Sequence, residues 1–254
     1  MTNRFTGIVF TFLLVQLSVY GQADNEIQVY SSPTIQKGWT MFELHSNHTF
    51  RGSDYLIDPK SAHWTNETLE ITHGVAKNFE IGFYTFTGFA PRGGYQYLGN
   101  QIRPRVTVPG EWKWPVGASL SAEFGFFRPD KDSKFIWQGE IRPIIDKTIR
   151  NWYFTFNPNL EFAISGDNKG IGLTPQFKTV YTIEKKVGVG IEYYAALGSF
   201  KVILPGRLQE HLIGPMIDLY VDPNWEVNGG VLFGLTKNSN QQIVKLLLGR
   251  RIGK

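Results

Sequence analysis

Apolar and polar residues alternate along most of the chain from Trp39 onward, which is the pattern of a β-strand with two unlike faces. The clearest stretch is 152–157, where Trp152, Phe154 and Phe156 alternate with more polar residues. A helix would mix these two sets, because its side chains repeat about every 3.6 residues. The pattern therefore predicts an all-β chain with one apolar face on every strand.

Turn-forming residues divide this region into about 12 strands of the length that a tilted membrane strand requires. The predicted strands are 39–51, 63–74, 78–89, 94–108, 115–128, 134–147, 151–165, 172–184, 187–199, 210–221, 225–236 and 242–253. Tight turns such as 75–78 and 185–186 alternate with longer polar connections such as 52–62 and 199–209. This asymmetry is typical of an up-and-down transmembrane β-barrel of antiparallel strands, whose short turns face the periplasm.

Prolines inside the predicted strands oppose this interpretation, because a proline has no N–H to donate to the sheet. They are Pro104, Pro143, Pro158, Pro175 and Pro215. We expect β-bulges at these positions, or strands shorter than drawn.

Alternation alone does not say which face is inside. A soluble sandwich would bury the apolar face, whereas a membrane barrel would turn it to lipid. All 7 tryptophans fall at predicted strand ends or turns, where an indole ring can lie at the membrane interface. We therefore expect the polar face to line a water-containing lumen, with an ordinary solvated face as the alternative. The candidate lumen-lining residues are Arg103, Arg105, Glu123, Glu140, Arg142, Glu161, Lys178 and Glu192.

The N-terminus has the layout of a secretory signal peptide, with Arg4 followed by an apolar run over 8–15 and small or polar residues to Gln22. The run is shorter than the roughly 20 apolar residues that a membrane-spanning helix needs. We expect a signal peptide over 1–22 and an outer-membrane barrel over 39–254. Residues 23–38 are expected to form a periplasmic lead-in segment that adds a strand or sits at the periplasmic mouth.

The composition of the chain limits the kinds of site and partner that can be expected. The chain has no cysteine, which excludes disulfides, thiolate metal sites and a cysteine nucleophile. The net charge of +4 comes without a basic cluster, so nucleic acid is not an expected partner. We predict no catalytic residue, no metal site and no cofactor. The expected partners are outer-membrane lipid, a small-molecule solute and the barrel-assembly machinery.

Lipid hydrolysis is the enzyme alternative, because a histidine that activates a serine from the same strand face would lie two residues away. Ser46 with His48 and Ser61 with His63 have this spacing. Ser46 and His48 share the apolar face and would meet lipid. A zinc site from His45 and His48 is poor, since a spacing of three places the two rings on opposite faces of a strand.

Hairpin register predicts a charged cluster in the lumen. Folding the strands about their turns brings Arg103 beside Ser121 and Glu123, and places Glu123 near Glu140. Arg142 then lies one inward-facing step from Glu140, and opposite charges on neighbouring strands attract. We expect Arg103, Glu123, Glu140 and Arg142 to form either a structural network or a constriction that sets ion preference.

Four stretches carry a resemblance to a known family: EIQVY at 26–30, FELHSN at 42–47, LEITHGV at 69–75 and FEIG at 79–82. They resemble the exported outer-membrane barrels of the phenol-degradation meta-pathway family. The resemblance is best over the first third of the chain and carries no catalytic motif. It implies a barrel and suggests transport of hydrophobic small molecules. We therefore expect a passive channel or transporter for small solutes, hydrophobic ones included. A structural or binding barrel with a plugged lumen is the alternative, followed by the lipid hydrolase.

Overall fold

The computed structural model describes residues 25–54, 62–166, 170–220 and 222–253, so the predicted signal peptide lies outside the described residues. The strands are β1 (Thr40–Ser53), β2 (Trp64–Ala76), β3 (Phe79–Ala90), β4 (Gly94–Thr107), β5 (Gly117–Phe127), β6 (Ile136–Ile149), β7 (Trp152–Ala163), β8 (Ile171–Ile183), β9 (Val187–Ala196), β10 (Glu210–Leu219), β11 (Trp225–Gly234) and β12 (Asn240–Ile252). Two single-turn helices, η1 (Gly110–Trp112) and η2 (Gly206–Leu208), lie in connections. Among the described residues, no helix has the length and apolar character to cross a membrane.

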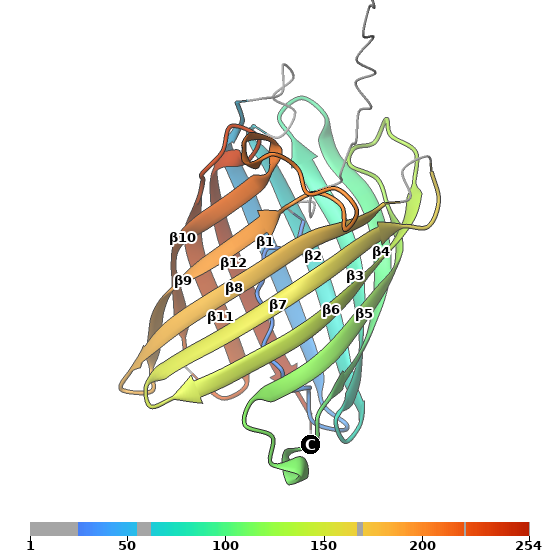
Figure 1. The fold of residues 1–254 in the computed structure, drawn as a ribbon. Helices are drawn as coiled ribbons and strands as arrows, with labels where there is room; N and C mark the ends of the chain where they lie inside the picture. The colour runs from blue at the N-terminus through green and yellow to red at the C-terminus, as the bar shows by residue number, and fades with distance from the viewer. Residues whose placement is uncertain (1–24, 55–61, 167–169, 221, 254) are drawn as a thin grey trace, which may run out of the picture.

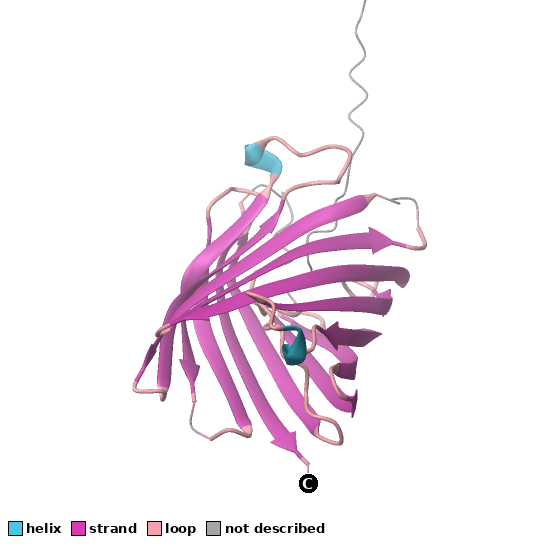
Figure 2. Cartoon of the chain, turned by 60° about the horizontal axis from the view of Figure 1, so that its bottom comes forward, coloured by secondary structure: helices cyan, strands magenta, loops and turns pink. Residues whose placement is uncertain are grey.

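Each strand pairs antiparallel with its neighbours in the chain, and β1 also pairs with β12, which closes the sheet into a barrel (Figure 1). Figure 2 shows the strands as a continuous tilted wall with the turns and loops gathered at its two ends. Closure leaves none of the 12 described strands with an unpaired edge. The predicted up-and-down barrel is confirmed, and the strand ends differ from their predicted positions by a few residues at most.

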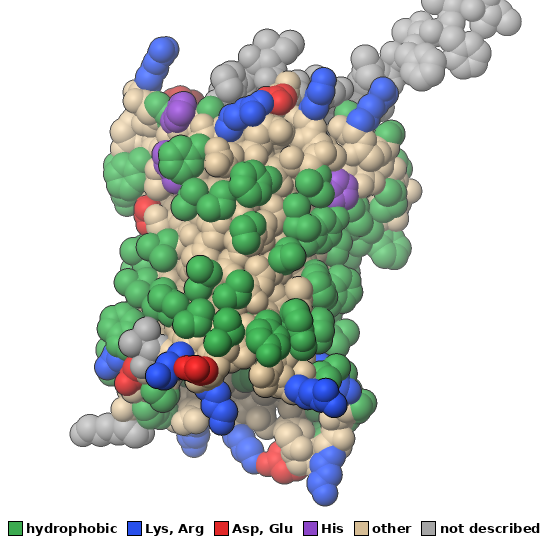
Figure 3. Space-filling model, turned by 90° about the vertical axis from the view of Figure 1, so that its left-hand side faces the viewer, with side chains coloured by type: hydrophobic (Ala, Val, Ile, Leu, Met, Phe, Trp, Pro, Cys, Tyr) green, Lys and Arg blue, Asp and Glu red, His purple; other side chains and the backbone are tan. Residues whose placement is uncertain are grey.

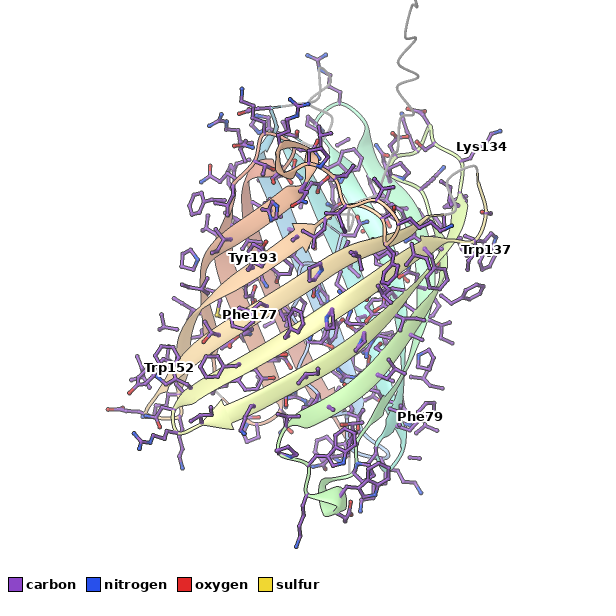
Figure 4. All side chains as sticks on the ribbon, in the orientation of Figure 1. Phe79, Lys134, Trp137, Trp152, Phe177 and Tyr193 are labelled. Atoms are coloured by element: carbon purple, nitrogen blue, oxygen red, sulfur yellow. The ribbon has the colours of Figure 1, made fainter. Side chains whose placement is uncertain are left out.

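The two faces of the wall differ as the alternation predicts. On β7, Phe156 is 43% exposed whereas its neighbour Asn157 is 0% exposed. On the face that Figure 3 shows, apolar side chains cover much of the barrel between two rims that carry charged residues. Trp137 and Trp152 point outward near opposite ends of the wall (Figure 4). The apolar face is therefore the outer one, and the polar face lines the interior.

The strands continue through all five prolines without bulges at those positions. The register shifts lie elsewhere, at Thr49/Arg51 and at two points on β2 and β3. Pro158 of β7 stays in register directly opposite Pro175 of β8. A residue in an antiparallel strand bonds to one neighbour at a time, so a missing N–H weakens the ladder on one side only. The expectation of bulges at the prolines is wrong for this reason, whereas β7 and β10 are shorter than drawn and end at Ala163 and Leu219.

Residues 25–38 run through the interior of the barrel, where Figure 1 shows them as the blue trace inside the ring of strands. The carbonyl of Asn25 accepts a hydrogen bond from Thr68 Oγ1 on the inner wall, at 2.7 Å. The other end reaches the rim of short turns, where Gly38 N donates to the carbonyl of Gly74 at 2.8 Å. This described part of the 23–38 segment runs through the interior to the rim of short turns, and residues 25–38 form no strand. Several of its polar groups find partners on the inward face. We call residues 25–38 the lumen segment.

Candidate functional site

The lumen segment is anchored at Tyr30 by side chains of β7. Tyr30 N donates to Asn157 Oδ1 at 2.8 Å. The carbonyl of Tyr30 accepts from Thr155 Oγ1 at 2.7 Å and from Asn157 Nδ2 at 3.1 Å. These inward side chains therefore satisfy the backbone of Tyr30 as a neighbouring strand would.

Further anchors lie nearer the short-turn rim. Ser32 donates from N to Asp146 Oδ2 at 2.6 Å and from Oγ to Asp146 Oδ1 at 3.0 Å. Arg105 donates to the carbonyls of Ser31 and Pro33, each at 3.0 Å. Charged and polar groups of β4 and β6 thus hold this part of the segment.

The ring of Tyr30 lies among guanidinium groups. The Cζ atoms of Arg142, Arg103 and Arg105 are 4.5, 5.1 and 5.6 Å from the ring centroid, within the range of cation–π contacts. The Tyr30 hydroxyl also donates to Glu70 Oε2 at 3.1 Å. Because Arg103 and Arg142 are almost completely buried, the lumen is filled around Tyr30.

The structure places all of the predicted lumen-lining residues on the inward face. Arg103, Arg105, Glu123, Glu140, Arg142 and Glu192 are buried, and Glu161 and Lys178 are half-buried. Glu161 accepts a hydrogen bond from Thr174 Oγ1 at 2.8 Å. Lys178 Nζ lies 3.0 Å from Asp218 Oδ2 and 3.5 Å from Glu192 Oε1.

Arg142 joins the two glutamates that the predicted register brings together. Glu123 of β5 is directly opposite Glu140 of β6. Arg142 Nη2 lies 3.5 Å from Glu123 Oε1, and Arg142 Nε donates to Glu140 Oε1. This guanidinium group therefore offsets the repulsion between two opposed carboxylates.

Arg103 belongs to a different ion-pair group. Its guanidinium group donates to Glu80 Oε1 at 2.9 Å and to Glu70 Oε1, on β3 and β2. In the β4–β5 register it is Arg105, two residues along, that faces Ser121. The predicted cluster is therefore divided, because a long arginine side chain can turn to either neighbouring strand and the carboxylates of β2 and β3 attract this one.

Sequence reasoning missed several buried charged residues on the same inward face. Glu70 and Glu80 bind Arg103, and Lys245 Nζ lies 2.5 Å from Glu192 Oε2. Glu70 lies between the outward residues Leu69 and Ile71, so the alternation carried the signal for it. No such signal existed for the lumen segment, which has no strand partner.

Two apolar clusters also occupy the interior. Ile27 and Val29 of the lumen segment pack with Tyr194, Leu212, Leu232 and Ile243. Across the barrel, Tyr84, Phe86, Leu98 and Phe127 form the second cluster, with Trp64 packed against it. The interior is therefore not polar throughout, and the first cluster adds apolar contacts to the anchors of the lumen segment.

The serine and histidine considered for lipid hydrolysis have other partners. Ser46 Oγ donates to Glu67 Oε1 at 2.7 Å, and His48 Nδ1 lies 2.8 Å from Thr65 Oγ1. This described pair therefore lacks the hydrogen bond by which a histidine activates a serine. Ser61 of the second pair lies outside the described residues.

No protein-family model and no curated protein matches the chain. Solved structures do match it. The COG4313 outer membrane channel from Pseudomonas putida F1 superposes with a TM-score of 0.62 at 10% identity, over 89% of this chain and 100% of that one. The chain has the fold of outer-membrane channel barrels. The KdgM porin gives a TM-score of 0.53 at 14% identity, over 83% of this chain and 98% of that one, and a second KdgM structure holds disordered oligogalacturonate. At these identities the likeness shows the fold.

Proposed function

We propose that the protein is an outer-membrane channel for small polar solutes, closed in this structure by its own lumen segment. The observation that carries the proposal is the kind of contact that holds residues 25–38. Between Asn25 and Pro33 they are held on the inner wall by its side chains, as Tyr30 is by Thr155 and Asn157, and they belong to no strand of the closed sheet. Water can replace such hydrogen bonds at modest net cost. The segment can therefore leave and open the channel while all strands of the barrel remain paired.

The chemistry of the inner wall supports polar solutes. Arg103, Arg105 and Arg142 face the interior together with glutamates. A hydrophobic solute would have to displace water from these charged groups without replacing its hydrogen bonds, which is costly. The resemblance to the phenol-degradation meta-pathway family favours hydrophobic solutes, and the apolar cluster around Leu232 is the part of the wall that suits them.

A barrel with a permanent plug is the second candidate. The number of contacts with the wall favours it. Tyr30 and Ser32 are hydrogen-bonded to the wall while the apolar side chains of the segment pack against it. If the segment never leaves, the barrel serves a structural or binding role.

Solute flux into liposomes tests the proposal. The folded protein is compared with a variant in which residues 25–37 are replaced by a glycine-serine linker of equal length, and heat-modifiable gel migration verifies that both barrels fold. We expect the linker variant to admit small sugars and amino acids much faster than the parent protein. A folded linker variant that stays impermeable would leave the permanent plug as the better account.

A further inference from the structure

Three buried side chains converge where the lumen segment meets the barrel wall. Glu26 of the segment, His45 of β1 and Glu70 of β2 each place one oxygen or nitrogen atom within 4.8 Å of the other two. His45 Nε2 lies 3.5 Å from Glu70 Oε2. A bound first-row metal ion lies about 2.0–2.2 Å from its nitrogen and oxygen ligands. Ligand atoms around such an ion are therefore slightly closer to one another than these three atoms are.

His45 points to a missing partner at this place. Its side chain is 1% exposed, yet Nδ1 makes no hydrogen bond to any described residue and Nε2 has only the long 3.5 Å contact to Glu70 Oε2. A buried imidazole normally has at least one partner, because burying an unpaired polar group costs free energy. A ligand between His45 and the carboxylates would supply it.

The surrounding network holds more carboxylates than guanidinium groups. Ion pairs join the carboxylates of Glu26, Glu70, Glu80, Glu123 and Glu140 to the guanidinium groups of Arg103, Arg105 and Arg142. Five carboxylates meet three guanidinium groups, so with every carboxylate ionised and His45 neutral these ion pairs would carry an excess of two negative charges. A divalent cation would balance this excess.

We propose that Glu26, His45 and Glu70 bind a divalent first-row transition-metal ion, which connects the lumen segment to the wall. One imidazole and two carboxylates suit Zn²⁺, Mn²⁺ or Fe²⁺, whereas Mg²⁺ and Ca²⁺ prefer oxygen ligands alone. The proposal goes beyond the channel function and does not depend on whether the barrel conducts.

Neighbouring groups already orient the carboxylate of Glu70. Its Oε1 accepts hydrogen bonds from Arg103 Nη2 and from Thr72 Oγ1, the latter at 2.6 Å. The other oxygen, Oε2, faces His45 and lies 3.1 Å from the Tyr30 hydroxyl. Partners of this kind hold metal ligands in place and strengthen binding.

Metal content of the folded protein tests the proposal. The protein is refolded into detergent with and without Zn²⁺, freed of loosely bound ions by gel filtration with a weak chelator, and measured by elemental analysis and equilibrium dialysis. Glu26→Gln and His45→Gln are the test variants, and Glu26→Gln leaves every strand unchanged. His73→Gln is the matched control, because His73 lies on the outer face of β2 and bonds Thr40 instead.

We expect one Zn²⁺ per chain in the parent protein and the His73→Gln variant, and binding at least about tenfold weaker in both test variants. Heat-modifiable migration verifies that each variant folds. Zn²⁺ retained equally by the two test variants would place the metal elsewhere and overturn the proposal. A folded parent protein with no bound Zn²⁺ would overturn it too, and would mean that protons balance the charge.

Discussion

Asn157 is the side chain whose removal tests the anchoring of the lumen segment most sharply. Its Oδ1 is the acceptor for the backbone N–H of Tyr30, at 2.8 Å. After an Asn157→Ala substitution the carbonyl of Tyr30 still accepts from Thr155. The substitution therefore leaves one buried group, the N–H of Tyr30, without its acceptor. An unpaired buried donor costs about 1–3 kcal/mol. Because every 1.4 kcal/mol is about tenfold in an equilibrium, the released fraction should rise roughly 5- to 150-fold.

Thiol labelling measures that fraction directly. The chain has no cysteine, so a Val29→Cys substitution introduces a single thiol at a site that is 5% exposed. A maleimide reaches this thiol only when the lumen segment leaves the wall. The labelling rate in detergent should therefore rise with the released fraction when Asn157→Ala is added.

Asn159 supplies the matched control. It lies two residues along β7 on the same inward face and is 1% exposed, but neither polar atom of its side chain is hydrogen-bonded to a described residue. Adding Asn159→Ala should leave the labelling rate unchanged. Equal acceleration by the two substitutions, or none by Asn157→Ala, would refute the assignment of Asn157 as an anchor.

Three other predictions concern the wall and its rims. Phe156→Arg puts a charge into the lipid-facing surface and should destabilise the barrel by about 2–4 kcal/mol near mid-membrane. Urea unfolding in vesicles measures this change, with Phe156→Leu as the control. Equal stability of the two variants would reverse the assignment of the faces. In the opened channel Glu26 has left with the lumen segment, so changing Glu123 and Glu140 to glutamine leaves Arg142 without its carboxylate partners. Reversal potentials should then shift toward anions, whereas an unchanged potential would leave this group a purely structural role. Epitope tags near Gly206 should be reachable on intact cells and tags near Lys186 should not, and the opposite labelling would invert the topology.

The strands of the barrel wall were predictable because the signals for them, alternation and turn residues, are local in the sequence. The stretch 151–165 was expected to be a strand, and β7 spans Trp152–Ala163 with Phe156 outside and Asn157 inside. Period-two alternation assigns both the strand and its faces, and turn residues limit its length. The prolines led to a wrong expectation of bulges, since each proline removes only one hydrogen-bond donor from the sheet.

The interior was less predictable because its contacts join residues far apart in the chain. Tyr30 and Asn157 are 127 residues apart, and nothing in the short segment around Tyr30 shows that side chains of β7 receive it. Register correctly placed Glu123 opposite Glu140. It could not assign Arg103, because the choice between the β5 side and Glu70 or Glu80 depends on the charge of every strand within reach.

Closure by the lumen segment is the central claim, and a reversible lock tests it most directly. Ser32→Cys combined with Asp146→Cys puts two thiols on neighbouring positions, since the Ser32 and Asp146 side chains are in contact with Oγ and Oδ1 3.0 Å apart, in a chain with no other cysteine. Single-channel recording then follows one barrel through oxidation and reduction. We predict no conductance while the disulfide holds the segment and repeated openings after reduction. An oxidised barrel that conducts as well as the reduced one would contradict the claim.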